Sequence, residues 1–414
     1  MITSPLSSPL LEIVDQVAHS LADPEKLWPH GRPDGGRAWP QSLAGGESGI
    51  ALLHIERART DRGDWATAHT WITAAIQGDI SAAANANLFF GAPALAFVVY
   101  SAASASSRYL RLLDRLDSAT CAVTETRLAA AHERLARRTR PLMEEFDLIQ
   151  GLSGLGAYHL ARHPHHRITR DVLTYLVRLT NPRATRGELP PWWMDCAPTG
   201  ALHPDYPGGH GNFGVAHGIH AVLSVLARAL RQGLTVPGLP DAVRRICAWT
   251  DQWRQGDESA PWWPGQLTVQ QVAEQHVDAA LRPRPSWCYG IAGTARAQQL
   301  AGLALDDRAR VEIAENAMLA VLRDPQRLDQ LPEIGLCHGM AGLLHSAWRM
   351  ATETGNTRIS AYLPPLAERL ATALRAGFHD PELLDGATGA ALALHTYSTG
   401  ITPRPHWDTF LALA

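Results

Sequence analysis

The sequence has almost no lysine and no cluster of basic residues. Lys26 is the only lysine among the 414 residues, so arginine supplies the rest of the positive charge, and the formal net charge at pH 7 is −3. Proteins that bind nucleic acids or anionic membrane surfaces usually present runs of lysine and arginine. We therefore expect no nucleic-acid partner and no polybasic contact with a membrane.

A secretory signal and a clear transmembrane segment are lacking as well. Residues 1–28 have no basic start and include Glu12 and Asp15 in their apolar part, which favours an amphipathic helix over a signal peptide. Residues 80–107 have no charged side chain, but alanine, asparagine and serine dominate and a Gly-Ala-Pro sequence interrupts them. We expect a helix buried inside a large cytoplasmic protein there rather than a membrane-spanning helix.

A disulfide framework is also unexpected. The cysteines are odd in number and no secretory signal precedes them, which favours reduced thiols. Two of them fall in amphipathic stretches, where we expect no chemical role. The third lies in a tryptophan-rich loop and is expected to be incidental, with a visit to the site as the alternative. These three are Cys121, Cys247 and Cys196.

What the sequence does contain is a repeated glycine pattern, called here a frame. Gly-x-x-Gly followed by small and apolar residues recurs seven times, with alanine at the second glycine in two copies. The first glycines of the frames are Gly46, Gly91, Gly151, Gly218, Gly290, Gly339 and Gly386. Each frame is expected to open a helix rich in Ala, Gly and Leu. Amphipathic stretches such as 170–180, 240–253 and 364–377 lie between the frames.

This repeat predicts an all-α protein. A unit of one tight inner helix and one amphipathic outer helix cannot bury its apolar face alone, but seven units closed into a ring can. We therefore expect a single domain over residues 1–414, an α/α toroid or double barrel of seven inner and seven outer helices. An open solenoid is the alternative, but solenoid periods are more uniform than the 45 to 72 residues between these glycines.

Two long irregular segments interrupt the repeat. They lie at about residues 181–212 and 256–287, are rich in Pro, Gly and Trp, and each contains a Pro-Trp-Trp sequence. Long irregular segments inside a compact domain are often functional. The tryptophans either form the wall of a cleft or pack the loops onto the barrel.

Two frames hold a cysteine at the same place. Cys288 and Cys337 each stand two residues before the first glycine of a frame, and His338 follows Cys337 directly. Equivalent places on neighbouring repeats predict that the two thiols meet. Two thiolates and an imidazole with an open fourth position are typical of a catalytic zinc. The alternative is that both cysteines are small buried hydrophobic residues, but the shared register favours one zinc ion per chain.

These motifs resemble those of the lanthipeptide cyclases, the LanC family, in its stand-alone form. The resemblance runs through all seven frames and is most specific in WCYG (287–290), CHG (337–339), NFGVAHG (212–218) and FDLIQGLSG (146–154). It implies an α/α toroid that holds zinc through Cys288, Cys337 and His338. Frame four departs from the pattern, with Ala221 at its second glycine, which affects packing rather than the ligands.

The resemblance also implies an activity, that of a lanthionine synthetase. Such a cyclase adds a peptide cysteine thiolate to a dehydroalanine or dehydrobutyrine in a Michael-type reaction and so closes a (methyl)lanthionine thioether ring. A free thiol has a pKa of about 8.5, and coordination by zinc deprotonates it. The implied partners are a dehydrated precursor peptide and a lanthipeptide dehydratase, in the cytoplasm or in a membrane-associated complex, and we expect a monomer.

The same resemblance assigns five further residues. His217 and Asp147 are expected to manage protons at the entrance to the inner helices, although their separate roles stay open. The structural alternative is a helix N-cap for Asp147 and a capping or loop hydrogen bond for His217. Arg284 is expected to stabilise the enolate oxygen. Tyr289 and Trp287 complete the motif and are expected to contact the substrate, but packing is an alternative role for both.

Three other functions were weighed. A LanC-like enzyme that adds glutathione to dehydrated proteins would keep the zinc and change the substrate. A non-catalytic peptide-binding scaffold in a dehydratase complex would have no need of three intact ligands. A toroidal prenyl- or glycosyl-processing enzyme would need acidic pairs or aspartate-rich stretches, which the sequence lacks.

Overall fold

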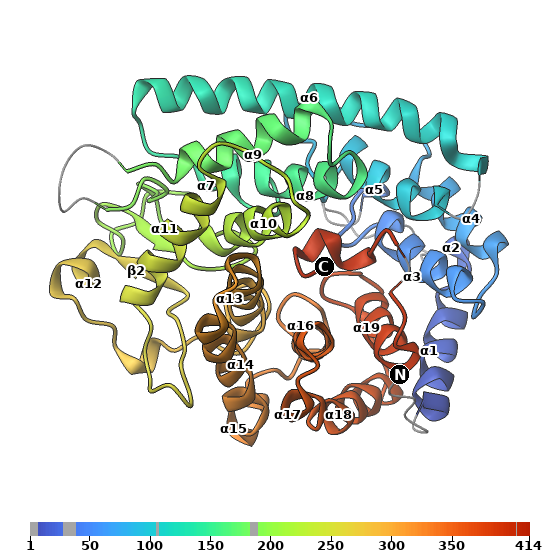
Figure 1. Cartoon of the computed structure of the whole chain (residues 1–414). Coiled ribbons are helices and arrows are strands. Elements are labelled where there is room, and N and C mark those ends of the chain that lie inside the picture. Colours follow the sequence, from blue (N-terminus) through green and yellow to red (C-terminus); the bar gives the residue numbers. More distant parts are fainter. Residues whose placement is uncertain (1–6, 28–38, 105–106, 183–188, 403) are drawn as a thin grey trace. The chain divides into compact units, whose positions relative to one another are not determined.

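The computed structural model describes most of the chain (Figure 1). The described residues are 7–27, 39–104, 107–182, 189–402 and 404–414. They divide into two compact units, of which the first is built from residues 1–120 and 329–409 and the second from residues 121–328 and 410–414. Each unit is described by itself below.

Seven helices in the described residues follow the glycine frames and are called the frame helices. They are α3 (Glu47–Arg59), α5 (Ala92–Ala103), α8 (Leu152–Arg162), α10 (Ile219–Arg231), α13 (Ile291–Leu305), α16 (Met340–Thr354) and α19 (Ala387–Thr399). Each begins directly after the first glycine of its frame. At Gly290 a Cβ atom would lie 2.0 Å from the carbonyl oxygen of Arg284, so the chain turns into the helix only where no side chain is present.

The frame helices are buried on nearly every face. In α10 every residue from Ile219 to Ala229 is buried, as expected of helices in an inner layer. Small residues allow close packing, since a Cβ at Gly156 of α8 would lie 2.9 Å from a methyl carbon of Val172. Each buried Leu, Ile or Val contributes roughly 1.5–3 kcal/mol to folding, so these helices form the core of both units.

Amphipathic flanking helices cover the frame helices. They are α1 (Ser7–Ser20), α4 (Trp65–Ala75), α6 (Leu110–Arg137), α9 (Arg167–Leu179), α11 (Leu239–Gln252), α14 (Arg308–Leu322) and α18 (Leu363–Arg375). In the first unit α4 packs on α3, while α1 and α18 pack on α19. In the second unit α9, α11 and α14 pack on α8, α10 and α13. The three outer helices expected from the sequence correspond to α9, α11 and α18.

Short helices connect these longer ones. They are α2 (Pro24–Leu27), η2 (Ser107–Tyr109), α7 (Met143–Phe146), α12 (Val269–Glu274), η3 (Ala279–Leu281), α15 (Pro325–Leu328), α17 (Thr357–Ser360) and η4 (Trp407–Leu411). Beside them the described residues contain two short strands, β1 (His210–Asn212) and β2 (Gln266–Thr268), which pair antiparallel.

The two apolar stretches of the N-terminal region adopt different structures. The amphipathic helix is confirmed as α1, whose buried side chains include Leu10 and Val14. Among the described residues of the uncharged stretch 80–107, the α-helix spans Ala92–Ala103, which is buried as expected, and Ser107 begins η2. Residues 80–90 form a loop instead, so the predicted extent of that helix was wrong. Among the described residues, no helix combines the length and apolarity needed to cross a bilayer.

The two irregular segments meet in the second unit. β1 belongs to the first segment and β2 to the second, and His210 pairs with Thr268. Residues 183–188 of the first segment lie outside the described residues. All four tryptophans of the two Pro-Trp-Trp sequences are buried, so they pack the loops onto the unit. One of them, Trp263, also lines a small cavity together with Asp251 and Arg310.

Candidate active site

Backbone hydrogen bonds join each frame to the next inside the first unit. They run from Leu43 N to Phe89 O (2.8 Å), from Leu336 N and Cys337 N to Leu384 O (2.8 and 2.9 Å), and from Leu383 N and Leu384 N to Ala44 O (both 3.0 Å). Frame six is therefore joined to frame seven, frame seven to frame one, and frame one to frame two. The bond from frame seven to frame one links the two ends of the repeat.

The second unit repeats the same pattern. The bonds there run from Leu148 N to Ala216 O (3.1 Å) and from Val215 N to Cys288 O (2.9 Å). In both units the third residue before a frame's glycine donates to the carbonyl of the second residue before the next glycine. Cys288 and Cys337 hold that second place in frames five and six, so the register expected from the sequence is present in the backbone.

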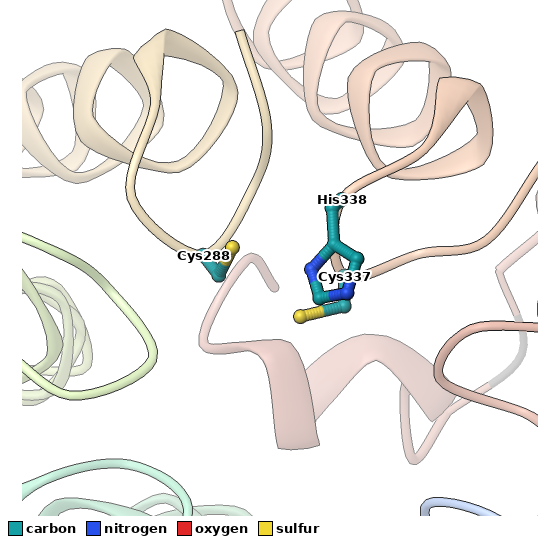
Figure 2. Close-up of side chains that lie close together, drawn as sticks. All are labelled: Cys288, Cys337 and His338. Carbon is teal, nitrogen blue, oxygen red and sulfur yellow. The ribbon is translucent and has the colours of Figure 1, made fainter. Parts of the chain in front are cut away.

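Cys337 and His338 lie in the turn that precedes α16, in the first unit. Cys337 is 8% exposed, and its Sγ lies within 4.8 Å of a ring nitrogen of His338. Figure 2 shows the thiol and the imidazole on this one turn. Because the backbone has not yet become helical here, adjacent residues direct their side chains to a common point. The turn therefore offers two ligands of the kinds that zinc prefers.

Cys288 lies in the corresponding turn before α13, in the second unit (Figure 2). The thiol is 5% exposed, and the hydroxyl of Ser286 lies 3.5 Å from its Sγ. Trp287 underlies the turn with no exposed surface, and its indole nitrogen donates to the carbonyl of Leu411 at 3.0 Å. This hydrogen bond fixes the residue next to the cysteine, so the structure shows Trp287 in a packing position.

His217 and Asp147 form a close pair in the second unit. His217 Nδ1 lies 2.5 Å from Asp147 Oδ2, and the carboxylate is completely buried while the imidazole is 26% exposed. The other carboxylate oxygen accepts the backbone N–H groups of Gln150 at 2.8 Å and Gly151 at 2.6 Å. Asp147 therefore closes the turn before α8 and also contacts the histidine, although the N-cap of that helix is Gly151 and not Asp147.

Tyr289 lies against this pair. Its ring centre is 6.2 Å from that of His217, and a Cβ at Gly214 would lie 2.8 Å from the tyrosine ring. The glycine thus lets the aromatic ring approach the histidine. Arg284 is exposed at the start of the same turn, where its carbonyl accepts the N–H of Ser286 at 2.8 Å.

Sequence reasoning missed Asp385. It lies in the turn before α19, and its Oδ1 is 3.3 Å from His338 Nε2. A signal for it was present. The place directly before the frame glycine holds His217, Tyr289 and His338 in frames four to six, and Asp385 is the one carboxylate at that place in the seven frames.

The remaining cysteines lie outside the turns before the frame helices. None of the five cysteines forms a disulfide. Cys247 is buried in α11, and burial raises its pKa to about 12. Burial also raises the pKa of Cys196. Thiols that stay protonated at neutral pH are poor metal ligands and nucleophiles, which agrees with the inert role expected for both.

A buried ionic cluster anchors α16, the helix behind the Cys337 turn. Asp408 accepts hydrogen bonds from His345 Nε2 at 2.7 Å and from Arg349 Nε and Nη2 at 2.5 and 2.6 Å. Burial alone would raise the pKa of Asp408, but Arg349 and His345 together hold it well below its usual value. The helix that presents Cys337 and His338 is therefore fixed by a charged partner.

The chain is similar to proteins of known family and structure. A family model described as lanthionine synthetase C-like protein matches residues 37–412. The nisin biosynthesis protein NisC of Lactococcus lactis subsp. lactis is 24% identical over 262 residues, which span 62% of this chain and 60% of that protein. The solved structure of nisin cyclase superposes with a TM-score of 0.79 at 20% identity, over 97% of both chains. This match shows the all-α fold class, an α/α toroid.

Proposed function

Because the chain belongs to the lanthionine synthetase C-like family, we propose that it is a zinc-dependent lanthipeptide cyclase. It adds cysteine thiolates of a dehydrated precursor peptide to dehydroalanine or dehydrobutyrine, which forms lanthionine or methyllanthionine rings. The similarity to NisC and to nisin cyclase supports this activity. The family match spans nearly the whole chain, which supports a single domain.

The repeated register of the frames is the observation that most supports a shared metal site. Frames three to five are joined in order by one type of backbone hydrogen bond, and frames six, seven, one and two are joined by the same type. Continuing this order from frame five to frame six makes the turns of Cys288 and Cys337 neighbours. We infer that Cys288, Cys337 and His338 together bind one zinc ion.

The chemistry of these donors fits zinc. Buried thiols and an imidazole are the ligands of catalytic zinc sites with three protein donors, and Cys337 and His338 already lie within 4.8 Å on one turn. When bound, zinc supplies a fourth position at which a peptide thiol loses its proton at neutral pH. Burial of both cysteines keeps competing water away from the sulfur atoms.

His217 and Asp147 manage the proton in this proposal. The new bond joins the cysteine sulfur to the β-carbon, the carbon–carbon double bond opens, and the resulting enolate needs a proton at its α-carbon. Asp147 accepts the Nδ1 proton of His217 and so fixes the ring with Nε2 directed away from the carboxylate. His217 Nε2 then exchanges the proton, because it belongs to the exposed part of the pair. Asp147 acts only through His217, since its carboxylate is completely buried.

Three neighbouring residues are proposed to contact the substrate or to support the turn of Cys288. Arg284 is exposed and is proposed to stabilise the enolate oxygen, and Tyr289 is proposed to contact the peptide beside His217. Trp287 is proposed to act on the substrate only through Cys288, whose turn it supports. A dehydratase partner, a monomeric state and a cytoplasmic location belong to the same proposal.

The first test is the zinc content of the purified protein. About one zinc per chain is expected, and Cys288→Ala, Cys337→Ala and His338→Ala should each lose it. Cys247→Ala is the matched control, because that cysteine is equally buried but lies in α11. A folded, reduced parent that neither contains nor takes up zinc would refute the metal site and favour the scaffold.

The second test is ring closure on a peptide that contains one dehydroalanine and one cysteine. The reaction is an intramolecular addition, so the mass stays constant while the thiol becomes resistant to alkylation. A gain of one glutathione on a cysteine-free dehydrated peptide, without ring closure on the first peptide, would favour the glutathione-adding activity instead. Parent protein with zinc but without either product would contradict both enzymatic functions.

A further inference from the structure

Asp385 approaches His338 from the next frame of the same unit. Its Oδ1 lies 3.3 Å from His338 Nε2, with 19% of the aspartate side chain and 36% of the histidine side chain exposed. The two residues are 47 positions apart, in the turns before α19 and α16. Their contact therefore depends on tertiary structure and not on the local chain.

The backbone holds this contact in place. Leu336 N and Cys337 N both donate to the carbonyl of Leu384, at 2.8 and 2.9 Å, so the residue before Asp385 is tied to the ligand turn. A Cβ at Gly335 would lie 2.5 Å from the Cα of Asp385. The segment that leads to Cys337 and His338 thus has a glycine at the point where the Asp385 backbone packs against it.

Asp385 does not cap the helix that follows it. The N-cap of α19 is Gly386, and no side chain caps that helix. Asp380 stabilises the preceding turn instead, since its carboxylate accepts the N–H of Glu382 at 2.9 Å and its carbonyl accepts the N–H of Ala387 at 2.9 Å. The Asp385 side chain is therefore not needed to begin the helix.

We infer that Asp385 is the positioning residue for His338 and, resting on the zinc site proposed above, that His338 binds the metal through Nδ1. A carboxylate near Nε2 favours the tautomer that has its proton on Nε2. The lone pair of the ring is then on Nδ1. Carboxylates that accept the second N–H of a ligating histidine orient the ring and raise its basicity, and Asp385 Oδ1 is within reach of this N–H at 3.3 Å from Nε2.

The decisive variant is Asp385→Asn, with Asp380→Asn as the matched control from the same turn. Zinc affinity is measured by competition with a chelator. Asp385→Asn should weaken binding by about 10- to 100-fold, Asp385→Glu should recover part of the loss, and Asp380→Asn should change it less than about twofold. Equal thermal midpoints of metal-free parent and Asp385→Asn would show that the loss is not caused by misfolding.

A second readout does not depend on metal. Nitrogen-15 NMR of histidine-labelled, metal-free protein reports the tautomer of each ring, and His338→Gln identifies the resonances of His338. The parent is expected to have the Nε2 proton, and Asp385→Asn should shift the ring toward the Nδ1 form.

The outcomes separate this inference from the proposed function. A parent that binds no zinc refutes the proposed site, while the tautomer still decides the role of Asp385. A parent that binds zinc, with unchanged affinity and an unchanged tautomer in Asp385→Asn, overturns the inference and leaves the proposed function in place.

Discussion

Two histidine–aspartate pairs occupy the same place in different frames and differ in construction. His217 stands directly before the glycine of frame four and contacts Asp147 through Nδ1 at 2.5 Å. His338 stands directly before the glycine of frame six and contacts Asp385 through Nε2 at 3.3 Å. The two carboxylates therefore face opposite nitrogens of their imidazole rings.

The ring nitrogen that each carboxylate faces suits the role proposed for each histidine. Nε2 lies at the far end of the ring, where it reaches a substrate, and His217 presents that atom. Nδ1 lies closer to the backbone, and it is the atom through which His338 is proposed to bind the metal. Burial follows the same division, since Asp147 is completely buried and Asp385 is 19% exposed. In the proposed function, one repeat position thus holds a proton-transfer residue in one frame and a metal ligand in another.

Replacing either histidine is expected to have the largest effect. His338→Asn is expected to abolish zinc binding and ring closure together, because it removes a ligand. His217→Asn is expected to retain zinc and to slow ring closure by about 10²- to 10⁴-fold, the usual contribution of a general acid or base. Zinc per chain and the rate of thiol protection are measured for both. Loss of zinc in His217→Asn would show that the two histidines do not differ as described.

The Asp147 carboxylate tests whether capping and positioning can be separated. Asp147→Asn keeps an oxygen for Gln150 and Gly151 but turns an N–H toward His217, which favours the wrong tautomer. We expect ring closure to slow by at least about 10²-fold with a small loss of stability. Asp147→Ala should also lower the free energy of unfolding by about 1–3 kcal/mol for each buried N–H left unbonded. Equal rates for Asp147→Asn and the parent would reduce Asp147 to a cap.

The second-glycine position of the frame pattern allows the turns of frames four and five to be compared. A Cβ at Gly293 would lie 2.1 Å from the carbonyl oxygen of Trp287, so Gly293→Ala should displace the Cys288 turn and destabilise the protein by about 4 kcal/mol. Frame four already has Ala221 there and still forms α10. Ala221→Gly should therefore cost only about 1 kcal/mol from lower helix propensity. Chemical denaturation measures both, and similar values would contradict the difference between frames.

Lowering the pH should destabilise the protein by protonating the buried histidines of the frame helices. His220 is fully buried, donates from Nδ1 to the carbonyl of Phe213 and accepts from Gln298 at Nε2, and burial lowers its pKa from 6.5 to about 4. The unfolded state binds a proton at a higher pH than the folded state does. The contribution of His220 to the free energy of unfolding is therefore complete above pH 6.5 and falls by about 3 kcal/mol as the pH drops toward 4. His54 and His395 share this direction, for which burial is the main cause.

The pH effect is measured as the free energy of unfolding between pH 7 and pH 4.5. His220→Gln should have a shallower slope than the parent, although it starts from lower stability. Identical slopes would mean that His220 does not remain neutral in the folded protein.

The smallest effect is expected at the two aromatic residues beside Cys288. Trp287→Phe removes the hydrogen bond to Leu411 and should lower the free energy of unfolding by about 1 kcal/mol, with KM unchanged. Tyr289→Phe should leave stability unchanged and raise KM, because Tyr289 lies beside His217. If Trp287→Phe is stable but has a raised KM, this would support the direct substrate contact expected from the sequence.

The frame helices could be predicted from the sequence because their signal is local. A glycine that tolerates no Cβ is followed directly by a helix of small and apolar residues, and the chain repeats that pattern seven times. The equivalence of Cys288 and Cys337 follows from the same register. The loop over residues 80–90 could not be predicted from composition, because an uncharged, alanine-rich stretch suits a loop as well as a helix.

The sequence by itself determined which residue types stand at the frame turns, and thereby the zinc ligands, His217 and Asp147 as candidates. Tertiary structure alone decided which aspartate faces which histidine, and at which nitrogen. Asp147 could be read as a cap and Asp385 had no visible role, because such contacts join turns that are 47 to 70 residues apart. A pattern along the chain records spacing, whereas the orientation of a ring is fixed only when neighbouring frames pack.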